Sequence, residues 1–364
     1  MKIKAAVVHQ EGAPFVMEEV DLAPPRAGEL LIKIVACGVC HTDAKSRDGY
    51  FTPFPAVLGH EGAGIVEAVG PNTEGFAAGD HVVLSYPYCC ECDNCRKGRP
   101  YYCYRSTELS FFGKFKDGYS PLSQNGASIN TFFGQSSFAT YAVVPTANAI
   151  KVDADIDLGL LAPLGCGIQT GAGAVINALN PQKEDSVVVF GTGTVGLSAI
   201  MGAVVVGCKK IIAVDILDTR LEIAREYGAT DVVNSKSEAD VAAVIKELTD
   251  GKGADYALDT TGVEACTLAA LKCLHTGGKG ACVAASKKLT FDPAPSYFIG
   301  RSWSYLIEGE AVPQTFIPQM IDWYKQGRFP IDRMISFYSF EQINQAFDDT
   351  KSGIATKAVL KMPD

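Results

Sequence analysis

The stretch VVVFGTGTVG (residues 187–196) decides the fold of the central part of the chain. It predicts a buried strand at 187–191, followed by glycines in the pattern GxGxxG and an apolar helix at 194–206. IIAVD (residues 211–215) predicts a second strand. A strand, a glycine turn, a helix and a strand in this order are typical of a dinucleotide-binding unit.

Strand and helix patterns continue to alternate after this unit. We expect helices at 220–227, 238–248 and 264–274, and strands at 231–233, 256–259 and 280–284. Such alternation predicts an α/β fold with a doubly wound parallel sheet.

The glycine turn and the acid after it define a candidate cofactor site. Its glycines are Gly191, Gly193 and Gly196, and the helix that starts at Thr194 and Val195 directs N–H groups and a positive dipole end at a pyrophosphate. Asp215 lies 19 residues after Gly196, where a carboxylate can accept hydrogen bonds from both hydroxyls of an adenosine ribose. Residues 216–218 supply no cation for a 2′-phosphate, so NAD is favoured over NADP. The alternative is a structural turn followed by a helix-capping acid.

The two ends of the chain differ in composition from this central part. Residues 1 to about 160 are rich in glycine, proline and short β-branched runs, which predict strands joined by turns. From about residue 307 we expect helices at 315–326 and 340–349 and a terminal strand, KAVLKM, that completes the first domain. The predicted domains are therefore 1–168 with 307–364, and 169–306.

Composition limits the classes of protein to consider. The chain has 364 residues, of which 47% are apolar and 20% charged, as in ordinary globular proteins of two domains. A net charge of −9 disfavours a nucleic-acid partner. No run predicts a membrane span or a signal peptide, so we expect a cytoplasmic protein without a membrane partner. In that compartment the twelve cysteines are expected to be metal ligands or buried residues rather than disulfides.

One cysteine cluster has the spacing of a metal site. Cys89, Cys92, Cys95 and Cys103 form CxxCxxCx7C, which allows one loop to surround a tetrahedral zinc ion with four thiolates. Cys90 is left over. A closed shell of this kind stabilises a loop but has no position for a substrate. An iron–sulfur cluster is the alternative, and the acidic composition disfavours a nucleic-acid zinc ribbon.

A second candidate set is dispersed over three segments. These are CGVCHTD (residues 37–43), GHEGAG (residues 59–64) and the segment around Cys166. Three ligands from separate segments leave a fourth tetrahedral position open, as a catalytic zinc requires. Taken singly, His60 or Cys166 is also typical of a buried core position.

Together and in this order, these motifs resemble the zinc-dependent alcohol dehydrogenases of the medium-chain dehydrogenase/reductase superfamily. The resemblance extends over essentially the whole chain. FFGQSSFATYAVV (residues 132–144) and PLGCGIQTGAGAVINAL (residues 163–179) are most similar to the aryl (benzyl) alcohol dehydrogenase branch. The resemblance implies a GroES-like catalytic domain formed by both ends of the chain, with a Rossmann NAD-binding domain between them.

The resemblance also implies a role for each residue of the dispersed set. Cys40, His60 and Cys166 would hold a catalytic zinc, with Glu61 as an occasional ligand and Asp43 orienting His60. Cys37 would be a small buried residue. With a structural zinc in the four-cysteine loop, the implied content is two zinc ions per chain.

Three further positions follow from the same resemblance. Thr42 would take the proton from the alcohol, His41 would meet the cofactor pyrophosphate, and Arg220 would approach the adenosine ribose. Lys45 is a departure, since some family members have a histidine there that passes the proton to solvent. A lysine of ordinary pKa accepts a proton poorly at neutral pH.

The implied reaction is the reversible, NAD-dependent oxidation of primary aromatic or allylic alcohols to aldehydes, by hydride transfer from a zinc-bound alkoxide to the nicotinamide. The alternatives are a glutathione-dependent formaldehyde dehydrogenase, a broad-range aliphatic alcohol dehydrogenase, a zinc-free quinone reductase and a silent nucleotide-binding protein. A homo-oligomer is implied, with a tetramer favoured over a dimer. Two or three of the following aromatic residues are expected to touch the substrate: Tyr50, Phe51, Phe54, Tyr86, Phe132, Phe133 and Phe138.

Overall fold

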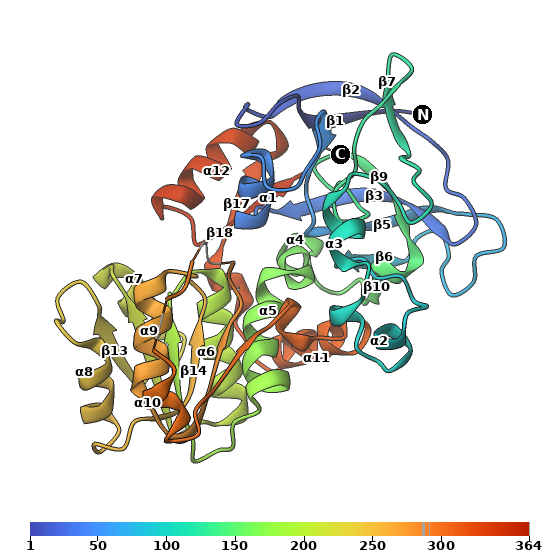
Figure 1. Cartoon of the computed structure of the whole chain (residues 1–364). Helices are drawn as coiled ribbons and strands as arrows, with labels where there is room; N and C mark the ends of the chain where they lie inside the picture. The colour runs from blue at the N-terminus through green and yellow to red at the C-terminus, as the bar shows by residue number, and fades with distance from the viewer. Residues whose placement is uncertain (286–287, 291, 364) are drawn as a thin grey trace. The chain divides into compact units, whose positions relative to one another are not determined.

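The computed structural model describes residues 1–285, 288–290 and 292–363. Residues 286, 287 and 291 of the predicted NAD-binding domain, and residue 364 of the predicted catalytic domain, lie outside this description. The chain forms two compact units, whose elements are labelled in Figure 1. The first unit comprises Met1–Cys166, Val312–Pro318 and Asp332–Asp364, and the second comprises Gly167–Ala311 and Gln319–Ile331.

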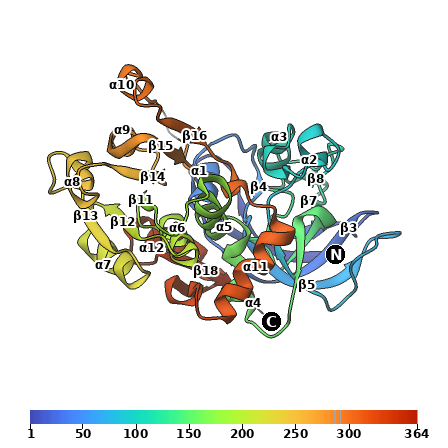
Figure 2. The same ribbon diagram turned by 90° about the horizontal axis from the view of Figure 1, so that it is seen from below.

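The second unit contains a six-stranded sheet with the order β13-β12-β11-β14-β15-β16, which can be followed in Figure 2. Every neighbouring pair is parallel. The strands are β11 (Ser186–Phe190), β12 (Lys210–Asp215), β13 (Asp231–Asn234), β14 (Ala254–Asp259), β15 (Leu274–Cys282) and β16 (Ser302–Tyr305). Strand order reverses between β11 and β14, so the predicted doubly wound sheet is confirmed.

Burial explains why the central segments form strands. All five residues of β11 are buried, and Val188 and Phe190 pack with Ile212 and Val214 of β12 in one apolar core. Parallel strands covered on both faces are typically near-continuous apolar runs. By contrast, β16 has three exposed residues out of four, and no apolar run in the sequence predicted it.

Helices fill the connections of this sheet. They are α5 (Gly167–Gly173), η4 (Ala174–Leu179), α6 (Thr194–Val206), α7 (Asp218–Glu226), α8 (Val241–Leu248), α9 (Glu264–Cys273), α10 (Ala294–Tyr297) and η5 (Glu308–Glu310). Helix α6 has the predicted bounds. Helix α8 begins at Val241 rather than 238, because the side chain of Asp240 caps it by accepting a hydrogen bond from the Ala243 N–H (3.1 Å). Strand β15 begins directly after α9, six residues before the predicted start at 280.

The first unit contains two sheets rich in antiparallel pairs. The five-stranded sheet has the order β4-β1-β2-β7-β8, and the seven-stranded sheet has the order β10-β6-β5-β3-β18-β17, with β9 also paired to β3. Strand β18 pairs antiparallel with β3, so the C-terminal segment completes a sheet of this unit. The strands are β1 (Lys2–Val8), β2 (Val16–Leu22), β3 (Glu29–Gly38), β4 (Ala56–Val57), β5 (Gly62–Val69), β6 (His81–Leu84), β7 (Leu122–Gln124), β8 (Ala127–Ser128), β9 (Tyr141–Pro145), β10 (Ala149–Val152), β17 (Ile335–Ser339) and β18 (Lys357–Lys361).

Short helices connect these strands. They are α1 (His41–Arg47), α2 (Asp93–Arg96), η1 (Pro100–Tyr102), α3 (Ser106–Phe111), η2 (Thr146–Asn148), α4 (Leu158–Leu161), η3 (Ala162–Gly165), η6 (Ile331–Met334), η7 (Phe340–Gln342) and α12 (Ile343–Ser352). Helix α11 (Pro313–Lys325) has residues in both units. The helix expected at 340–349 is therefore η7 continued by α12.

Residues 167–168, 307–311 and 319–331 group with the second unit, whereas the predicted bounds place them in the first domain. The Arg328 guanidinium donates a hydrogen bond to the carbonyl of Val205 in α6 (2.9 Å). Trp323 and Phe329 are buried, with ring centroids 6.2 Å apart. The Arg328 hydrogen bond joins this segment to α6, and local composition does not indicate such a contact.

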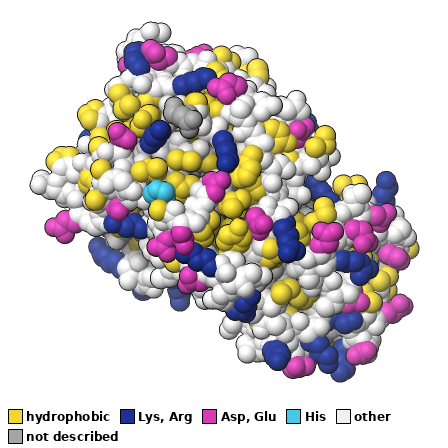
Figure 3. Space-filling model, turned by 180° about the vertical axis from the view of Figure 1, so that it is seen from behind, with side chains coloured by type: hydrophobic (Ala, Val, Ile, Leu, Met, Phe, Trp, Pro, Cys, Tyr) yellow, Lys and Arg dark blue, Asp and Glu magenta, His cyan; other side chains and the backbone are white. Residues whose placement is uncertain are grey.

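Charged side chains of both signs alternate with apolar ones over the face in Figure 3, and that face has no extended basic area. Among the described residues, no single helix is both long and apolar enough to cross a membrane. The bent pair Leu158–Gly165 and Gly167–Leu179 has the required length and composition only when both helices are taken together, and most of its residues are buried within the protein.

Candidate functional site

A cluster of ligating side chains forms in the first unit from three separate segments. Cys40 is the N-cap of α1, His60 and Glu61 directly precede β5, and Cys166 directly follows η3. Their ligating atoms all lie within 4.8 Å of one another. We call Cys40, His60, Glu61 and Cys166 the open cluster.

Asp43 joins two of these segments. Its Oδ2 accepts a hydrogen bond from the Cys40 N–H (3.1 Å), and its Oδ1 accepts from the Gly59 N–H (3.1 Å) and lies 2.9 Å from Nδ1 of His60. Asp43 and His60 are both buried. Because a carboxylate accepts the Nδ1 proton, Nε2 of His60 has its lone pair directed at the cluster.

The donor set of the open cluster fits a zinc ion. His60 Nε2 is buried and has no hydrogen-bond partner within the part of the chain that the structure describes. Ligand atoms bound to one zinc at 2.0–2.3 Å lie ~3.3–3.8 Å apart. This separation is within the 4.8 Å that limits the distances between the ligating atoms of the open cluster. Hydrogen bonding with the Cys166 thiol, together with the nearby His60, holds the pKa of Cys40 well below its ordinary value despite burial, which favours the thiolate that binds a metal.

Lys357 of β18 is a neighbour of this cluster that the sequence did not indicate. Its Nζ forms an ion pair with Oε2 of Glu61 and donates a hydrogen bond to the Val39 carbonyl (3.0 Å). Lys357 is only 2% exposed, and Glu61 is fully buried. Burial raises the pKa of Glu61 to about 6, although Lys357 opposes this shift. The pairing of β18 with β3 brings Lys357 to this position, and no local motif contains it.

Helix α1 positions the other predicted residues of this region. His41 is exposed, whereas Thr42 and Lys45 are half-buried. Cys37 is fully buried in the apolar core, as expected for a small structural residue. The helix begins at His41 with Cys40 as its N-cap, so Thr42 is two residues after Cys40 in the first turn.

The four predicted thiols of the 89–103 loop form a second group, the closed cluster. The Sγ atoms of Cys89, Cys92, Cys95 and Cys103 all lie within 4.8 Å of one another. Backbone N–H groups donate hydrogen bonds to two of these sulfur atoms. Cys89 Sγ accepts from the Cys92 N–H (3.4 Å), and Cys103 Sγ accepts from the N–H groups of Cys89 (3.3 Å) and Arg105 (3.4 Å). Cys90 is exposed, and no disulfide joins any of the twelve cysteines, all of which are described. Four thiols with inward N–H donors fit a structural zinc.

The glycine turn of the second unit fits a dinucleotide. Gly191 adopts φ +86°, in the left-handed region, and a Cβ there would lie 2.7 Å from Thr260 Oγ1. A Cβ on Gly196 would lie 1.8 Å from the Gly191 carbonyl oxygen, so α6 packs directly on the turn. A Cβ on Gly193 would meet no atom within 4 Å, which leaves space beside the N-terminus of α6 at Thr194 and Val195.

Asp215 ends β12 and has more protein partners than the sequence indicated. Its Oδ2 accepts hydrogen bonds from both the N–H and the hydroxyl of Thr192 (2.8 Å each). Its Oδ1 accepts from the N–H groups of Ile216 (2.7 Å) and Leu217 (3.2 Å). The carboxylate is 7% exposed and is held at the edge of the sheet next to the glycine turn. Arg220 is half-buried in α7.

The predicted aromatic residues differ in where they lie. Phe133 and Phe132 pack against the His60 ring, with centroids 4.6 and 5.5 Å away. Phe138 packs against Phe15 in the core instead. Tyr50 and Phe51 are exposed and contact Phe111, whose ring lies 5.2 Å from that of Phe133. Phe54 is half-buried and Tyr86 is buried.

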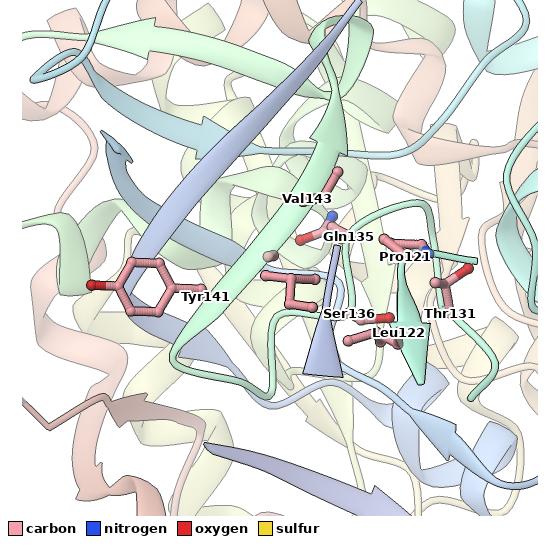
Figure 4. A pocket seen from close by; sticks show the side chains of 9 residues that line it. Pro121, Leu122, Thr131, Gln135, Ser136, Tyr141 and Val143 are labelled. Atoms are coloured by element: carbon pink, nitrogen blue, oxygen red, sulfur yellow. The ribbon is translucent and has the colours of Figure 1, made fainter. Parts of the chain in front are cut away.

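Figure 4 shows a crevice elsewhere in the first unit. It is too narrow to admit a water molecule, and the Tyr141 hydroxyl points away from it. It therefore offers no binding site. Its lining residues are Leu22, Pro121, Leu122, Thr131, Gln135, Ser136, Tyr141, Ala142 and Val143.

Comparisons with known proteins agree with this geometry. The model of the alcohol dehydrogenase GroES-like domain matches residues 26–154, and that of the zinc-binding dehydrogenases matches residues 194–326. The chain is 43% identical to geraniol dehydrogenase of Castellaniella defragrans over 362 residues, which cover 98% of this chain and 97% of that protein.

Solved structures agree equally closely. The crystal structure of an alcohol dehydrogenase zinc-binding domain protein from Burkholderia ambifaria has a TM-score of 0.97 at 48% identity. That of benzyl alcohol dehydrogenase from Acinetobacter calcoaceticus has a TM-score of 0.96 at 44% identity. In both comparisons all of each chain is covered.

Fold and site together define a zinc-binding dehydrogenase with a GroES-like domain and a Rossmann domain. The chain belongs to the zinc-dependent alcohol dehydrogenases of the medium-chain dehydrogenase/reductase superfamily. The predicted family, fold class and enzyme class are thereby confirmed. The family uses zinc and NAD.

Proposed function

We propose that this enzyme oxidises primary aromatic or allylic alcohols to aldehydes with NAD, in a reversible reaction. The observation that carries the proposal is the convergence of half-buried Cys40 and Cys166 with buried His60 in one cluster. Similarity to a geraniol dehydrogenase and a benzyl alcohol dehydrogenase supports the substrate class, since geraniol is an allylic alcohol and benzyl alcohol an aromatic one.

Cys40, His60 and Cys166 would hold the catalytic zinc. Zinc bound there is a Lewis acid that lowers the pKa of a substrate hydroxyl, and NAD is the hydride acceptor. Asp43 keeps Nε2 of His60 directed at the metal position. Glu61 is an alternate ligand in this proposal, because a carboxylate oxygen lies within 4.8 Å of the other three ligating atoms while the carboxylate also pairs with Lys357.

Thr42 accepts the substrate proton in this proposal. Helix α1 holds it two residues after Cys40, and it is half-buried. His41 is exposed and binds the cofactor pyrophosphate. Lys45 is one turn further along the same helix, and its positive charge disfavours it as the next proton acceptor. Proton release to solvent then uses water or a cofactor hydroxyl.

NAD would bind to the second unit at the glycine turn. Gly191, Gly193, Gly196, Thr194 and Val195 receive the pyrophosphate, in agreement with the open space beside Gly193. Asp215 receives the adenosine ribose, and Arg220 lies near it. A fixed carboxylate repels a 2′-phosphate. We therefore expect Asp215→Ala to lower the ratio of the Kd of NADPH to that of NADH by at least about tenfold. Equal affinity of the parent enzyme for both cofactors would contradict this assignment.

The closed cluster would hold the structural zinc, which gives two zinc ions per chain. Its four thiols occupy every tetrahedral position, so it takes no part in the reaction. The alternative of an iron–sulfur cluster predicts visible absorption from iron and sulfide, whereas two zinc ions absorb no visible light. Metal analysis of the purified protein separates these outcomes.

The substrate proposal is supported by the aromatic side chains near the metal ligands. Phe132 and Phe133 lie against His60, and Phe111, Tyr50 and Phe51 continue the row to the surface. Burial of a flat apolar group against such rings is worth about 25 cal/mol per Å².

The test is a screen of NAD reduction with benzyl, cinnamyl, allylic and short aliphatic alcohols. We expect the highest kcat/KM for the aromatic and allylic alcohols. Higher kcat/KM for short aliphatic alcohols would favour the broad-range alternative. Formaldehyde oxidation only in the presence of glutathione would favour the formaldehyde dehydrogenase alternative. A protein with two zinc ions per chain that oxidises none of these alcohols would contradict the proposal.

We also propose a cytoplasmic homo-oligomer, a tetramer rather than a dimer. Strand β16 is at the end of the sheet order, and Tyr297 and Phe298 beside it are 81% and 82% exposed. An open strand edge with large exposed aromatic rings is typical of a subunit contact. Light scattering on the eluted protein should give four times the 38.7 kDa of one chain, and a mass of one chain would contradict the proposal. Cell fractionation tests the location.

A further inference from the structure

Gln135 belongs to the FFGQSSF motif (residues 132–138), and the proposed function gives this glutamine no role. It is 2% exposed, and its side chain forms four hydrogen bonds. Nε2 donates to the carbonyls of His60 (3.0 Å) and Ser85 (3.2 Å), and Oε1 accepts from the Gly62 N–H (3.1 Å) and the Ser137 hydroxyl (2.8 Å). A primary amide has two donor hydrogens and two acceptor lone pairs, so the capacity of Gln135 is fully used.

Ser85 extends this network to the third metal ligand. It follows β6, is fully buried, and donates a hydrogen bond from Oγ to the Gly165 carbonyl (2.7 Å). Gly165 directly precedes Cys166. A Cβ on Gly165 would lie 2.0 Å from the Leu84 carbonyl oxygen, so the two backbone segments are in direct contact. Asn148 also donates to the Ser85 carbonyl (2.9 Å), so this carbonyl accepts hydrogen bonds from both Gln135 and Asn148.

These bonds form a continuous path through all three ligand segments. Asp43 joins the segment of Cys40 to that of His60. Gln135 joins the His60 segment to Ser85, and Ser85 joins Gln135 to the Cys166 segment. Every side chain on the path other than the two cysteines is buried. In a low-dielectric interior such bonds fix the backbone, because an unpaired partner would remain desolvated.

We propose that Gln135 and Ser85 are positioning residues that set the separation of His60 and Cys166, and thereby the metal affinity of the open cluster. This inference rests on the proposed function, in which these ligands hold zinc. Metal–ligand distances vary by only about 0.2 Å in intact sites. Replacing a group that orients a ligand typically weakens metal binding 10- to 100-fold.

The test compares Ser85→Ala and Gln135→Met with the parent enzyme. Zinc release is followed against graded chelator concentrations, and the visible spectrum is recorded after Co(II) replaces zinc. We expect zinc at the open cluster to bind about 10-fold more weakly in Ser85→Ala and up to about 100-fold more weakly in Gln135→Met. The Co(II) absorption should shift in both, because the geometry of the thiolate ligands changes. The closed cluster should retain its zinc unchanged.

Ser120→Ala is the matched control. Its hydroxyl donates to the Ile129 carbonyl (2.5 Å) in the same unit, and neither residue adjoins a metal ligand. This variant should release zinc like the parent. If Gln135→Met does not fold, Ser85→Ala decides the question.

Unchanged zinc affinity and an unchanged Co(II) spectrum in folded variants would overturn the inference and leave the proposed function intact. Equal weakening at both clusters would also overturn it, because it would show general destabilisation. A parent enzyme that binds no metal at the open cluster would overturn the proposed function and this inference together.

Discussion

The closed and open clusters, each proposed to hold a metal, are built in different ways. The closed cluster takes four thiols from the single loop 89–103 and directs local N–H groups at their sulfur atoms. The open cluster takes its side chains from three distant segments and depends on buried groups around them. A local loop provides a stable shell with no free position. A shell assembled by the fold leaves one position for chemistry, at the cost of buried polar groups that must all be paired.

We expect the largest effect from Cys166→Ser, which removes one proposed ligand of the open cluster. We expect turnover of benzyl alcohol to fall by at least ~10³-fold, since a metal Lewis acid contributes several kcal/mol and ~4 kcal/mol corresponds to 10³ in rate. Zinc content should fall from two ions per chain to one. Steady-state kinetics and metal analysis check this, and parental turnover with one zinc would contradict the assignment.

Thr42→Val removes a hydroxyl two residues after Cys40 without removing a proposed ligand. We expect kcat to fall by ~10²-fold, the usual contribution of a positioned acid–base group. Zinc content should remain at two ions per chain, which distinguishes a proton role from a metal role. Thr42→Ser should recover most of the rate, and full activity of Thr42→Val would exclude the hydroxyl from the reaction.

Cys103→Ser removes one thiol of the closed cluster and tests whether that cluster holds a structural zinc. Loss of one thiolate should release the structural zinc and lower the thermal midpoint by ~6–12 °C, if ~3 kcal/mol of stability is lost from a unit of this size. Residues 89–103 should become sensitive to protease. The neighbouring Cys90→Ser is the matched control, because Cys90 is exposed and lies outside the cluster. Equal effects of the two changes would show that the closed cluster holds no metal.

Asp255→Asn is a control in a region without metal ligands, and its effect should be the smallest. Asp255 is the second residue of β14. It accepts hydrogen bonds from the N–H (2.8 Å) and hydroxyl (2.6 Å) of Ser186, and it lies 2.8 Å from Nε2 of His275. Burial raises its pKa, but the bonds from Ser186 and the pairing with His275 outweigh burial and lower it overall.

The sign of the pH effect follows from that lowered pKa. The contribution of Asp255 to stability is present above its unfolded pKa of about 3.9 and is lost as pH falls through the folded value. The thermal midpoint of Asp255→Asn should therefore lie below that of the parent at pH 7, and the difference should shrink below about pH 4. A difference that stays constant down to pH 3 would contradict this account.

Local patterns predicted the parts of the molecule that are determined locally. The spacing of four cysteines indicated the closed cluster, and the apolar run at 194–206 gave the bounds of α6. The glycine turn and Asp215 were also read correctly as neighbours in space, because a strand, a turn and a strand place them at one edge of the sheet.

The family resemblance indicated the dispersed open cluster, but other contacts over long sequence separations were not predicted. Lys357 reaches Glu61 only because β18 pairs with β3, and Gln135 reaches His60 from 75 residues away. Thr192 holds Asp215 through a hydrogen bond across the sheet edge, and its position between two glycines suggested only a turn. Such contacts depend on tertiary structure, and one sequence contains no local pattern for them.

The central claim is that Cys40, His60 and Cys166 hold a metal. Diffraction data collected at the zinc absorption edge test it most directly. The account predicts two anomalous peaks per chain, one at the closed cluster and one ~2.0–2.3 Å from Cys40 Sγ, His60 Nε2 and Cys166 Sγ. A zinc-replete crystal with a peak at the closed cluster alone would contradict it.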